Sequence, residues 1–222
     1  MSGPGPPDDR TPGPVVVLGA GGHGLVVAEA LAASGWNVLG FVERDEARAG
    51  ESRGGFEVLG GDAALARLDP ASVRVALGVG GLDAGPSAAA RRRVLETAVA
   101  RGFRAAGLVH PSAVLAPSAT VEETAQIHAG AVVQGGAHVA EGAIVNTRAV
   151  VEHDASVGAW AHVAPGAVVL GDVEVGPGAL VGAGATVLSG LTVGAETLVG
   201  AGAVLTRDAG GGVWVGAPAR RR

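Results

Sequence analysis

Residues 125–163 read AQIHAG AVVQGG AHVAEG AIVNTR AVVEHD ASVGAW AHV, a run of hexads that each begin with alanine. The third residue of every hexad is aliphatic, and this spacing continues without a break for seventeen positions, from Val109 to Leu205. A period of six fits neither the 3.6-residue turn of an α-helix nor a meander with turns every 8–12 residues. It is typical of hexapeptide repeats, which fold as a parallel β-helix with the aliphatic side chain pointing inward. Because three hexads make one triangular coil, the seventeen repeats predict a prism of five to six coils.

The composition agrees with narrow coils and limits the possible functions. The chain has 39 Gly and is 48% hydrophobic but only 3% aromatic, which suits a small interior filled by Ala and Val. The absence of Cys excludes disulfides, a thiolate nucleophile and Cys-ligated zinc, and it fits a reducing cytoplasm. We find no signal peptide and no apolar run of about 18 residues, so we expect a cytoplasmic protein with no membrane partner. The net charge of −5 argues against binding to nucleic acid.

The chain before the repeats alternates between apolar strands and helices. The expected strands are residues 15–18, 37–42 and 73–77, and the expected helices are residues 25–34, 62–68 and 86–101. This alternation implies a small parallel sheet with helices packed on it. The predicted organisation is a disordered leader (1–13), a Rossmann-like domain (14–108), a β-helix domain (109–208) and a C-terminal tail (209–222), with the terminal arginines and the run Arg91–Arg93 exposed to solvent.

A glycine-rich loop, Gly19-Ala20-Gly21-Gly22-His23-Gly24, follows the first expected strand and opens the first helix. In that context backbone N–H groups and the helix dipole can bind a phosphate, and Glu43 at the end of the second strand can accept a ribose hydroxyl. A tight turn without a ligand is the alternative. About 95 residues supply only one half of a doubly wound dinucleotide fold, so a mononucleotide or a sugar nucleotide fits better than a nicotinamide cofactor.

One pair of polar residues in the repeats has the chemistry of a general base. His153 lies two residues after the inward Val151, at an expected corner, and Asp154 is adjacent to it. A neighbouring carboxylate makes an imidazole more basic and stabilises the imidazolium that forms on proton abstraction. With no Cys and no G-x-S-x-G elbow, the nucleophile is expected to come from the substrate, by direct transfer.

Four segments together resemble one family: GAGGHG (19–24), NTRAVVEHD (146–154), His162 nine residues after His153, and VWVGAPARR (213–221). The family is that of the bacterial sugar O-/N-acyltransferases of the hexapeptide class, which includes the sialic acid O-acetyltransferases and the UDP-4-amino-sugar N-acetyltransferases. The resemblance covers the chain from Val15 onward. It implies a left-handed β-helix, a homotrimer, and acetyl-CoA bound in the cleft between neighbouring prisms.

The resemblance also implies roles for individual residues. His153 would deprotonate the acceptor, Asp154 would raise its basicity, Asn146 would contact the acceptor, and His162 would contact the CoA thioester or pantetheine. The acetyl-CoA channel would be lined by Gly182, Ala183, Gly200 and Ala201. The sugar nucleotide would be bound by Gly21, Gly22, His23, Glu43, Arg44 and Gly78. The chain departs from the family at Glu43-Arg44, where an Asp pair is common, and at Arg148, where a small residue is common.

These observations predict an acetyl-CoA-dependent acetyltransferase that modifies the amine or hydroxyl of a nucleotide-linked amino sugar, such as a UDP- or dTDP-amino sugar, without a metal. One alternative is an O-acetyltransferase for a free sugar such as sialic acid. A protein like the γ-class carbonic anhydrases, with zinc held by three His, is a more remote alternative, since the shortest gap between two His here is nine residues. A sugar-nucleotide-binding scaffold without catalysis leaves the pair of His153 and Asp154 unexplained.

Overall fold

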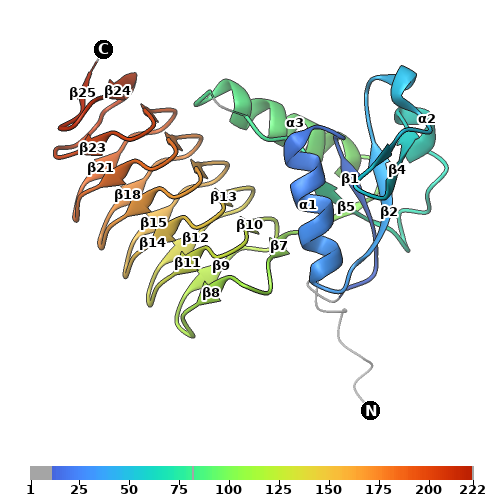
Figure 1. Cartoon of the computed structure of the whole chain (residues 1–222), viewed down its shortest axis with the longest axis horizontal. Coiled ribbons are helices and arrows are strands. Elements are labelled where there is room, and N and C mark those ends of the chain that lie inside the picture. The colour runs from blue at the N-terminus through green and yellow to red at the C-terminus, as the bar shows by residue number, and fades with distance from the viewer. Residues whose placement is uncertain (1–11, 82, 222) are drawn as a thin grey trace. The chain divides into compact units, whose positions relative to one another are not determined.

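The computed structural model describes residues 12–81 and 83–221, and Figure 1 shows its course. These residues form two compact units. The first consists of the chain up to Val79 together with Leu95–Gly107, and the second consists of Gly80–Val94 together with the chain from Leu108 onward. Most of the expected leader (1–13) lies outside the described residues.

The first unit is a small α/β domain, as the sequence predicts. Its strands are β1 (Pro14–Leu18), β2 (Asn37–Val42), β3 (Ser52–Arg53), β4 (Phe56–Gly60), β5 (Arg74–Leu77) and β6 (Arg104–Ala105). Its helical elements are α1 (Gly22–Ala33), the 3-10 turn η1 (Glu46–Arg48), α2 (Asp62–Leu65) and the C-terminal part of α3 (Pro86–Val99). The strand order is β3-β4-β2-β1-β5-β6, and all neighbours are parallel except β3 and β4.

The hairpin of β3 and β4 was not predicted from the sequence. Its turn is Gly54-Gly55, with φ angles of 59° and 86°. Two consecutive residues at positive φ form the type of two-residue turn that joins antiparallel strands, and Gly-Gly is one of the dipeptides that favour it. The dipeptide was therefore the available signal for this hairpin.

The sheet places the glycine loop at the position where open α/β sheets bind ligands. Strand β1 lies between β2 on one side and β5 on the other, so the direction of the chain connections reverses between β1 and β5. The loop after β1 (19–24) and the loop after β5 (78–81) both leave from the carboxyl ends of these parallel strands. Ligands of doubly wound folds bind in the crevice at such a reversal.

The second unit is a left-handed parallel β-helix with three sheets, which we name by their first strands. The β7 sheet consists of β7 (Leu108–Val109), β10 (Gln126–Ile127), β13 (Ile144–Val145), β16 (His162–Val163), β19 (Leu180–Val181), β22 (Leu198–Val199), β24 (Val213–Val215) and β25 (Arg220–Arg221). The β8 sheet consists of β8 (Val114–Leu115), β11 (Val132–Val133), β14 (Val150–Val151), β17 (Val168–Val169), β20 (Thr186–Val187) and β23 (Val204–Leu205). The β9 sheet consists of β9 (Thr120–Val121), β12 (His138–Val139), β15 (Ser156–Val157), β18 (Glu174–Val175) and β21 (Thr192–Val193). Figure 1 shows these short strands stacked in successive coils.

The register between coils is 18 residues, which is three hexads. Ile127, for example, pairs with Val109 on one side and Val145 on the other. The second residue of each two-residue strand points inward, and from Val121 to Leu205 these residues and the preceding alanines form the core. The interior is so narrow that one aliphatic residue and one alanine from each hexad fill it. The same pattern therefore recurs every six residues, and this period predicts the unit.

Two segments differ from the predicted division of the chain. Gly80–Val94, expected within the Rossmann-like domain, groups with the β-helix. The expected tail from residue 209 contains β24, which pairs in parallel with β22, and β25, which turns back antiparallel to β24. These last residues extend the β7 sheet and cover its end. Within residues 12–81 and 83–221, no helix is both long and apolar enough to cross a membrane.

Candidate active site

Most corners of the β-helix contain a residue whose backbone is in the left-handed conformation. Thirteen successive hexads, from Gly130 to Gly202, have a residue at positive φ three positions after the inward aliphatic. Eight of these residues are glycine, which adopts this conformation without a steric penalty. The other five are Arg148, Asp154, Trp160, Asp172 and Glu196, with φ between 54° and 62°. A non-glycine residue in this region costs about 1–2 kcal/mol relative to glycine.

Three of these five side chains belong to one coil. Arg148, Asp154 and Trp160 occupy its three corners, and each lies close to the glycine corner one coil earlier. A Cβ atom at Gly130 would lie 3.3 Å from Cγ of Arg148, and one at Gly142 would lie 2.5 Å from the ring of Trp160. The glycines of one coil therefore leave the space that the side chains of the next coil occupy.

His153 and Asp154 form the pair that the sequence predicts. Nδ1 of His153 lies 3.0 Å from Oδ2 of Asp154, at the corner between β14 and β15. The hydrogen bond to Asp154 raises the pKa of His153, partly opposed by desolvation, and the negative charge of the same carboxylate adds to the increase. The charges of Asp172 and Glu152 act in the same direction. When Nδ1 donates to Asp154, Nε2 is the nitrogen that can accept a proton.

Asn146 and His162 form a second pair. Oδ1 of Asn146 accepts a hydrogen bond of 2.8 Å from the backbone N–H of Thr147, which fixes the orientation of the amide. Its Nδ2 group therefore faces Nε2 of His162 at 3.0 Å and donates to it. The consequence is that Nε2 of His162 acts as an acceptor, with the ring proton on Nδ1.

The structure does not bring the two pairs together within one chain. Asn146 begins the corner between the β7 and β8 sheets, and His162 lies on β16 of the β7 sheet. His153 lies at the next corner, between the β8 and β9 sheets. The β8 sheet separates these corners, although the residues are close in sequence. The side chains of His153 and Asp154 are 61% and 62% exposed.

The glycine loop of the first unit has the form of an anion-binding turn. A Cβ atom on Gly24 would lie 2.0 Å from the carbonyl oxygen of Gly19, and one on Gly78 would lie 2.5 Å from the same oxygen. These glycines allow β1, α1 and β5 to pack closely. Gly21 and Gly22, in contrast, have no atom within 4 Å of such a Cβ. Gly21 caps α1 without a side-chain hydrogen bond, so the helix N-terminus is open to a ligand, and His23 lies in its first turn.

Glu43 lies at this loop, as the sequence predicts, but its carboxylate already contacts other groups of the protein. Its Oε2 accepts a 2.8 Å hydrogen bond from the N–H of Ala20. Arg48, which sequence reasoning missed, lies 3.5 Å from Glu43 and donates to the carbonyl oxygen of Ala20. Arg44 is exposed. The cation beside the loop is thus Arg48, and only the return of the chain through η1 places it there.

Gly182 and Gly200, predicted to line an acetyl-CoA channel, have a packing role of their own. A Cβ on Gly182 would lie 2.6 Å from the backbone nitrogen of Ala201, and one on Gly200 would lie 3.0 Å from Val215. These glycines allow consecutive coils to approach closely. Ala183 and Ala201 are exposed beside them.

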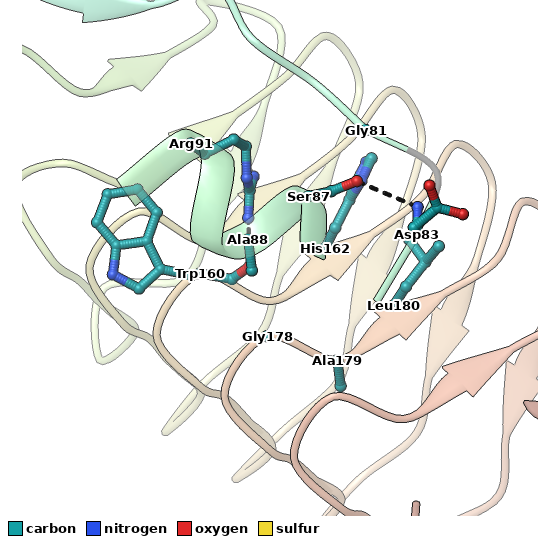
Figure 2. A pocket seen from close by; sticks show the side chains of 10 residues that line it. All are labelled: Gly81, Asp83, Ser87, Ala88, Arg91, Trp160, His162, Gly178, Ala179 and Leu180. Carbon is teal, nitrogen blue, oxygen red and sulfur yellow. Dashed lines mark hydrogen bonds between the residues drawn. The ribbon is translucent and has the colours of Figure 1, made fainter. Parts of the chain in front are cut away.

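Arg91 corrects the expectation of a solvated arginine run. It is only 3% exposed, and burial lowers its pKa to about 10. Figure 2 shows its side chain extending from α3 to the backbone carbonyl of Trp160, to which Nη2 donates. A cavity of about 10 Å³ lies beside it, lined by residues that include Ser87 and His162. The N–H of Gly85 donates to the carbonyl of Gly178 (3.1 Å), so two backbone corners hold the segment Gly80–Val94 on the β-helix.

A metal centre finds no support in the described part of the chain. No group of three or more His, Cys, Asp or Glu side chains within it is arranged to hold a metal ion.

Comparisons with known proteins agree with the geometry of both units. Residues 14–98 match the family model described as the PglD N-terminal domain. The chain is 37% identical to the acetyltransferase domain of PglB from Neisseria gonorrhoeae, a structure in complex with acetyl coenzyme A, over 95% of this chain and 100% of that one (TM-score 0.85). It is also 37% identical to PerB from Caulobacter crescentus, a structure in complex with CoA and GDP-perosamine, over 94% and 96% of the two chains (TM-score 0.85). No curated protein sequence matches it.

A more distant structure, WeeI from Acinetobacter baumannii, shares the fold at 21% identity over 93% of this chain and 98% of that one (TM-score 0.82). The similarity to PglB and PerB extends through both units and is not confined to the repeats. It decides against the carbonic-anhydrase-like and non-catalytic alternatives. The protein belongs to the bacterial sugar acyltransferases of the hexapeptide-repeat class and is a sugar acetyltransferase.

Proposed function

We propose that the protein transfers an acetyl group from acetyl-CoA to the amine of a nucleotide-linked amino sugar. The observation that carries this proposal is the hydrogen-bonded pair of His153 and Asp154 on a chain that aligns end to end with enzymes of this kind. One of them was solved with acetyl coenzyme A and another with CoA and GDP-perosamine, a sugar nucleotide. The donor and the class of acceptor are carried over from these relatives.

The chemistry is a direct transfer in which His153 acts as the general base. The acceptor nitrogen attacks the thioester carbonyl, a new C–N bond forms, and Nε2 of His153 takes the proton that the nitrogen loses. The tetrahedral intermediate then collapses, the C–S bond breaks, and CoA leaves as its thiol after the imidazolium returns the proton. Asp154 holds the ring by Nδ1 and stabilises the imidazolium. Binding both substrates in one cleft removes much of the entropic barrier.

The glycine loop is the proposed site for the phosphates of the acceptor. Its support is the open space at Gly21 and Gly22, the start of α1 without a side-chain cap, and the position between the carboxyl ends of β1 and β5. Arg48 adds a positive charge beside the loop, and it is already paired with Glu43. We therefore assign Glu43 to the support of the loop, and its contact with the nucleoside stays a prediction together with that of Arg44.

We propose that the active protein is a homotrimer with sites between neighbouring chains. Five of the six outward positions of the β8 sheet are valine, and these form a valine stripe that is interrupted by Thr186 and consists of Val114, Val132, Val150, Val168 and Val204. In a single chain Val114 is 59% exposed and the others are half-buried. The matching positions of the β9 sheet are polar, so the β8 sheet is the better candidate for burial against another copy.

The same assembly accounts for the separation of the predicted site residues. His153 is too exposed in one chain to work in a water-excluded site, and it lies at one edge of the valine stripe. A second copy packed on this stripe covers His153 and brings other residues to it. The acetyl-CoA contacts predicted for His162, Gly182 and Gly200 would then come from the neighbouring chain.

The test is thiol release from acetyl-CoA with a panel of acceptors: UDP-, dTDP- and GDP-linked amino sugars, the matching hydroxyl sugars, and free sialic acid. Turnover of an amino-sugar nucleotide with a product mass of one added acetyl group supports the proposal. Faster turnover of free sialic acid would replace it with the O-acetyltransferase alternative.

A further inference from the structure

We infer that two glycines, Gly136 and Gly171, form a slot that positions His153 and Asp154, so that these glycines determine how well the pair works. The inference depends on the proposed function, in which His153 is the base. It concerns positioning residues, because neither glycine has a side chain that can react. The two glycines lie at the same corner as the pair, one coil before and one coil after it.

Gly171 is the glycine one coil after His153, since 18 residues separate them. A Cβ atom on Gly171 would lie 2.5 Å from both Cε1 and Nε2 of the imidazole and 3.1 Å from Cδ2. Real Cβ atoms essentially never come within 3.0 Å of another heavy atom. The ring therefore occupies the volume that any other residue at position 171 would fill. The edge of the ring that lies against Gly171 carries Nε2, the nitrogen that takes the proton in the proposed reaction.

Gly136 has the same relation to Asp154, one coil earlier. A Cβ atom there would lie 2.3 Å from Oδ1 and 3.3 Å from Cγ of the carboxylate. Oδ2 of the same carboxylate is the atom that contacts His153. Asp154 is thus held with one oxygen over Gly136 and the other on the imidazole.

Backbone hydrogen bonds fix the spacing of these three coils. The N–H of Asp154 donates to the carbonyl of Gly135 (3.0 Å), and the N–H of Asp172 donates to the carbonyl of His153 (3.1 Å). These bonds tie successive corners together, and the atoms nearest to an added Cβ at position 136 or 171 are side-chain atoms of Asp154 and His153. The movable part is the imidazole, which is 61% exposed and can rotate away.

The predicted effect of Gly171→Ala follows from these distances. Ordinary contact begins at 3.4 Å, so the ring has to retreat by about 1 Å from the new methyl group. A displacement of about 1 Å in a catalytic group can lower the rate by about 10²-fold. Gly171 is not among the residues at positive φ, so alanine adds no backbone strain, and its N–H is retained. We expect kcat to fall by about 10²-fold while the KM values for acetyl-CoA and acceptor change little.

The matched control is Gly210→Ala. Gly210 is also outside the positive-φ residues and has no atom within 4 Å of an added Cβ. We expect it to keep wild-type kcat and melting temperature. Ring ¹⁵N signals should separate the two variants further. Those of His153 should shift in Gly171→Ala while those of His110 and His138 stay in place, and none should shift in Gly210→Ala.

A double variant keeps the inference testable if Gly171→Ala is unstable. The double variant His153→Ala with Gly171→Ala lacks the imidazole, so the clash disappears. Its melting temperature should equal that of the single variant His153→Ala. An equally unstable double variant would place the clash elsewhere and overturn the slot. Wild-type kcat in Gly171→Ala, together with an inactive His153→Ala, would also overturn it. Activity retained in His153→Ala would instead refute the base, while the His153 signals would still report the slot.

Discussion

Replacing Asp154 with glycine should make the protein slightly more stable and much less active. Asp154 has a φ of 58°, a conformation that costs an L-residue about 1–2 kcal/mol and glycine nothing. Asp tolerates this region better than most residues, so the lower end of the range applies. Glycine loses about 0.5–1 kcal/mol through the greater entropy of its unfolded chain. The expected net gain is therefore small, about 0–0.5 kcal/mol, or at most about 2 °C in melting temperature for a chain of this length.

The activity of Asp154→Gly should change in the opposite direction. The variant keeps the imidazole but loses the 3.0 Å hydrogen bond that orients it and that is the main cause of its raised pKa. We expect kcat to fall by about 10- to 10³-fold, less than the loss expected for the base itself. The pH profile should also move. His153 must be neutral to accept a proton, so the acid limb of kcat follows its pKa and should shift to lower pH, although Asp172 and Glu152 still act on the ring.

The assay combines calorimetric unfolding with thiol-release kinetics between pH 5 and 9. Arg148→Gly is the matched control, since Arg148 has a φ of 55° at the preceding corner of the same coil. It should show a similar small gain in stability with unchanged kcat. An Asp154→Gly protein that is less stable than wild type by more than about 1 kcal/mol would refute the strain argument. An acid limb that stays in place would refute the role of the carboxylate in setting the pKa of His153.

Three further predictions test the base, the acceptor loop and the assembly. His153→Ala should lower kcat by about 10²–10⁴-fold with little change in affinity for acetyl-CoA, whereas His110→Ala should leave turnover intact. Gly22→Val places a branched side chain in the open space above the loop, so the acceptor KM should rise strongly while calorimetry still detects CoA binding; unchanged KM would remove the loop as the acceptor site. Light scattering should show a trimer, and Val150→Glu, which puts a charge in the valine stripe, should reduce its mass together with its activity; a fully active monomer would contradict the assembly.

Both folds could be predicted from the sequence because their signals are local and repeated. The inward residues from Val109 to Leu205 recur every six positions, and the strand register of 18 residues is a multiple of that period. In the first unit, the loop between β1 and α1 is recognisable because its glycines lie within six residues of each other. Gly24 has to be glycine, since a Cβ atom there would collide with the carbonyl oxygen of Gly19. The pairing of His153 with Asp154 was predictable for the same reason. The two residues are adjacent in the sequence, so their contact does not depend on how the coils stack.

Other features depend on contacts between residues that are far apart in the chain. Arg48 reaches the glycine loop only because η1 turns back toward β1. Arg91 is buried against the carbonyl of Trp160, and a run of three arginines gives no sign of which one will be covered. The segment Gly80–Val94 groups with the β-helix, although the sequence predicts it as part of the α/β domain.

The sequence by itself determined the coil, its inward residues, the loop that begins α1 and the identity of the pair at position 153–154. Only the tertiary structure decided that Gly171 leaves room for the imidazole, that Gly136 leaves room for the carboxylate, and that Asn146 and His153 point from different corners of one coil. The physical reason is that a hexad fixes its own backbone through local sterics and its inward side chain. The position of an outward side chain, however, is set by the residues one coil away. The presence or absence of one Cβ atom on such a residue decides whether a ring can pack against it.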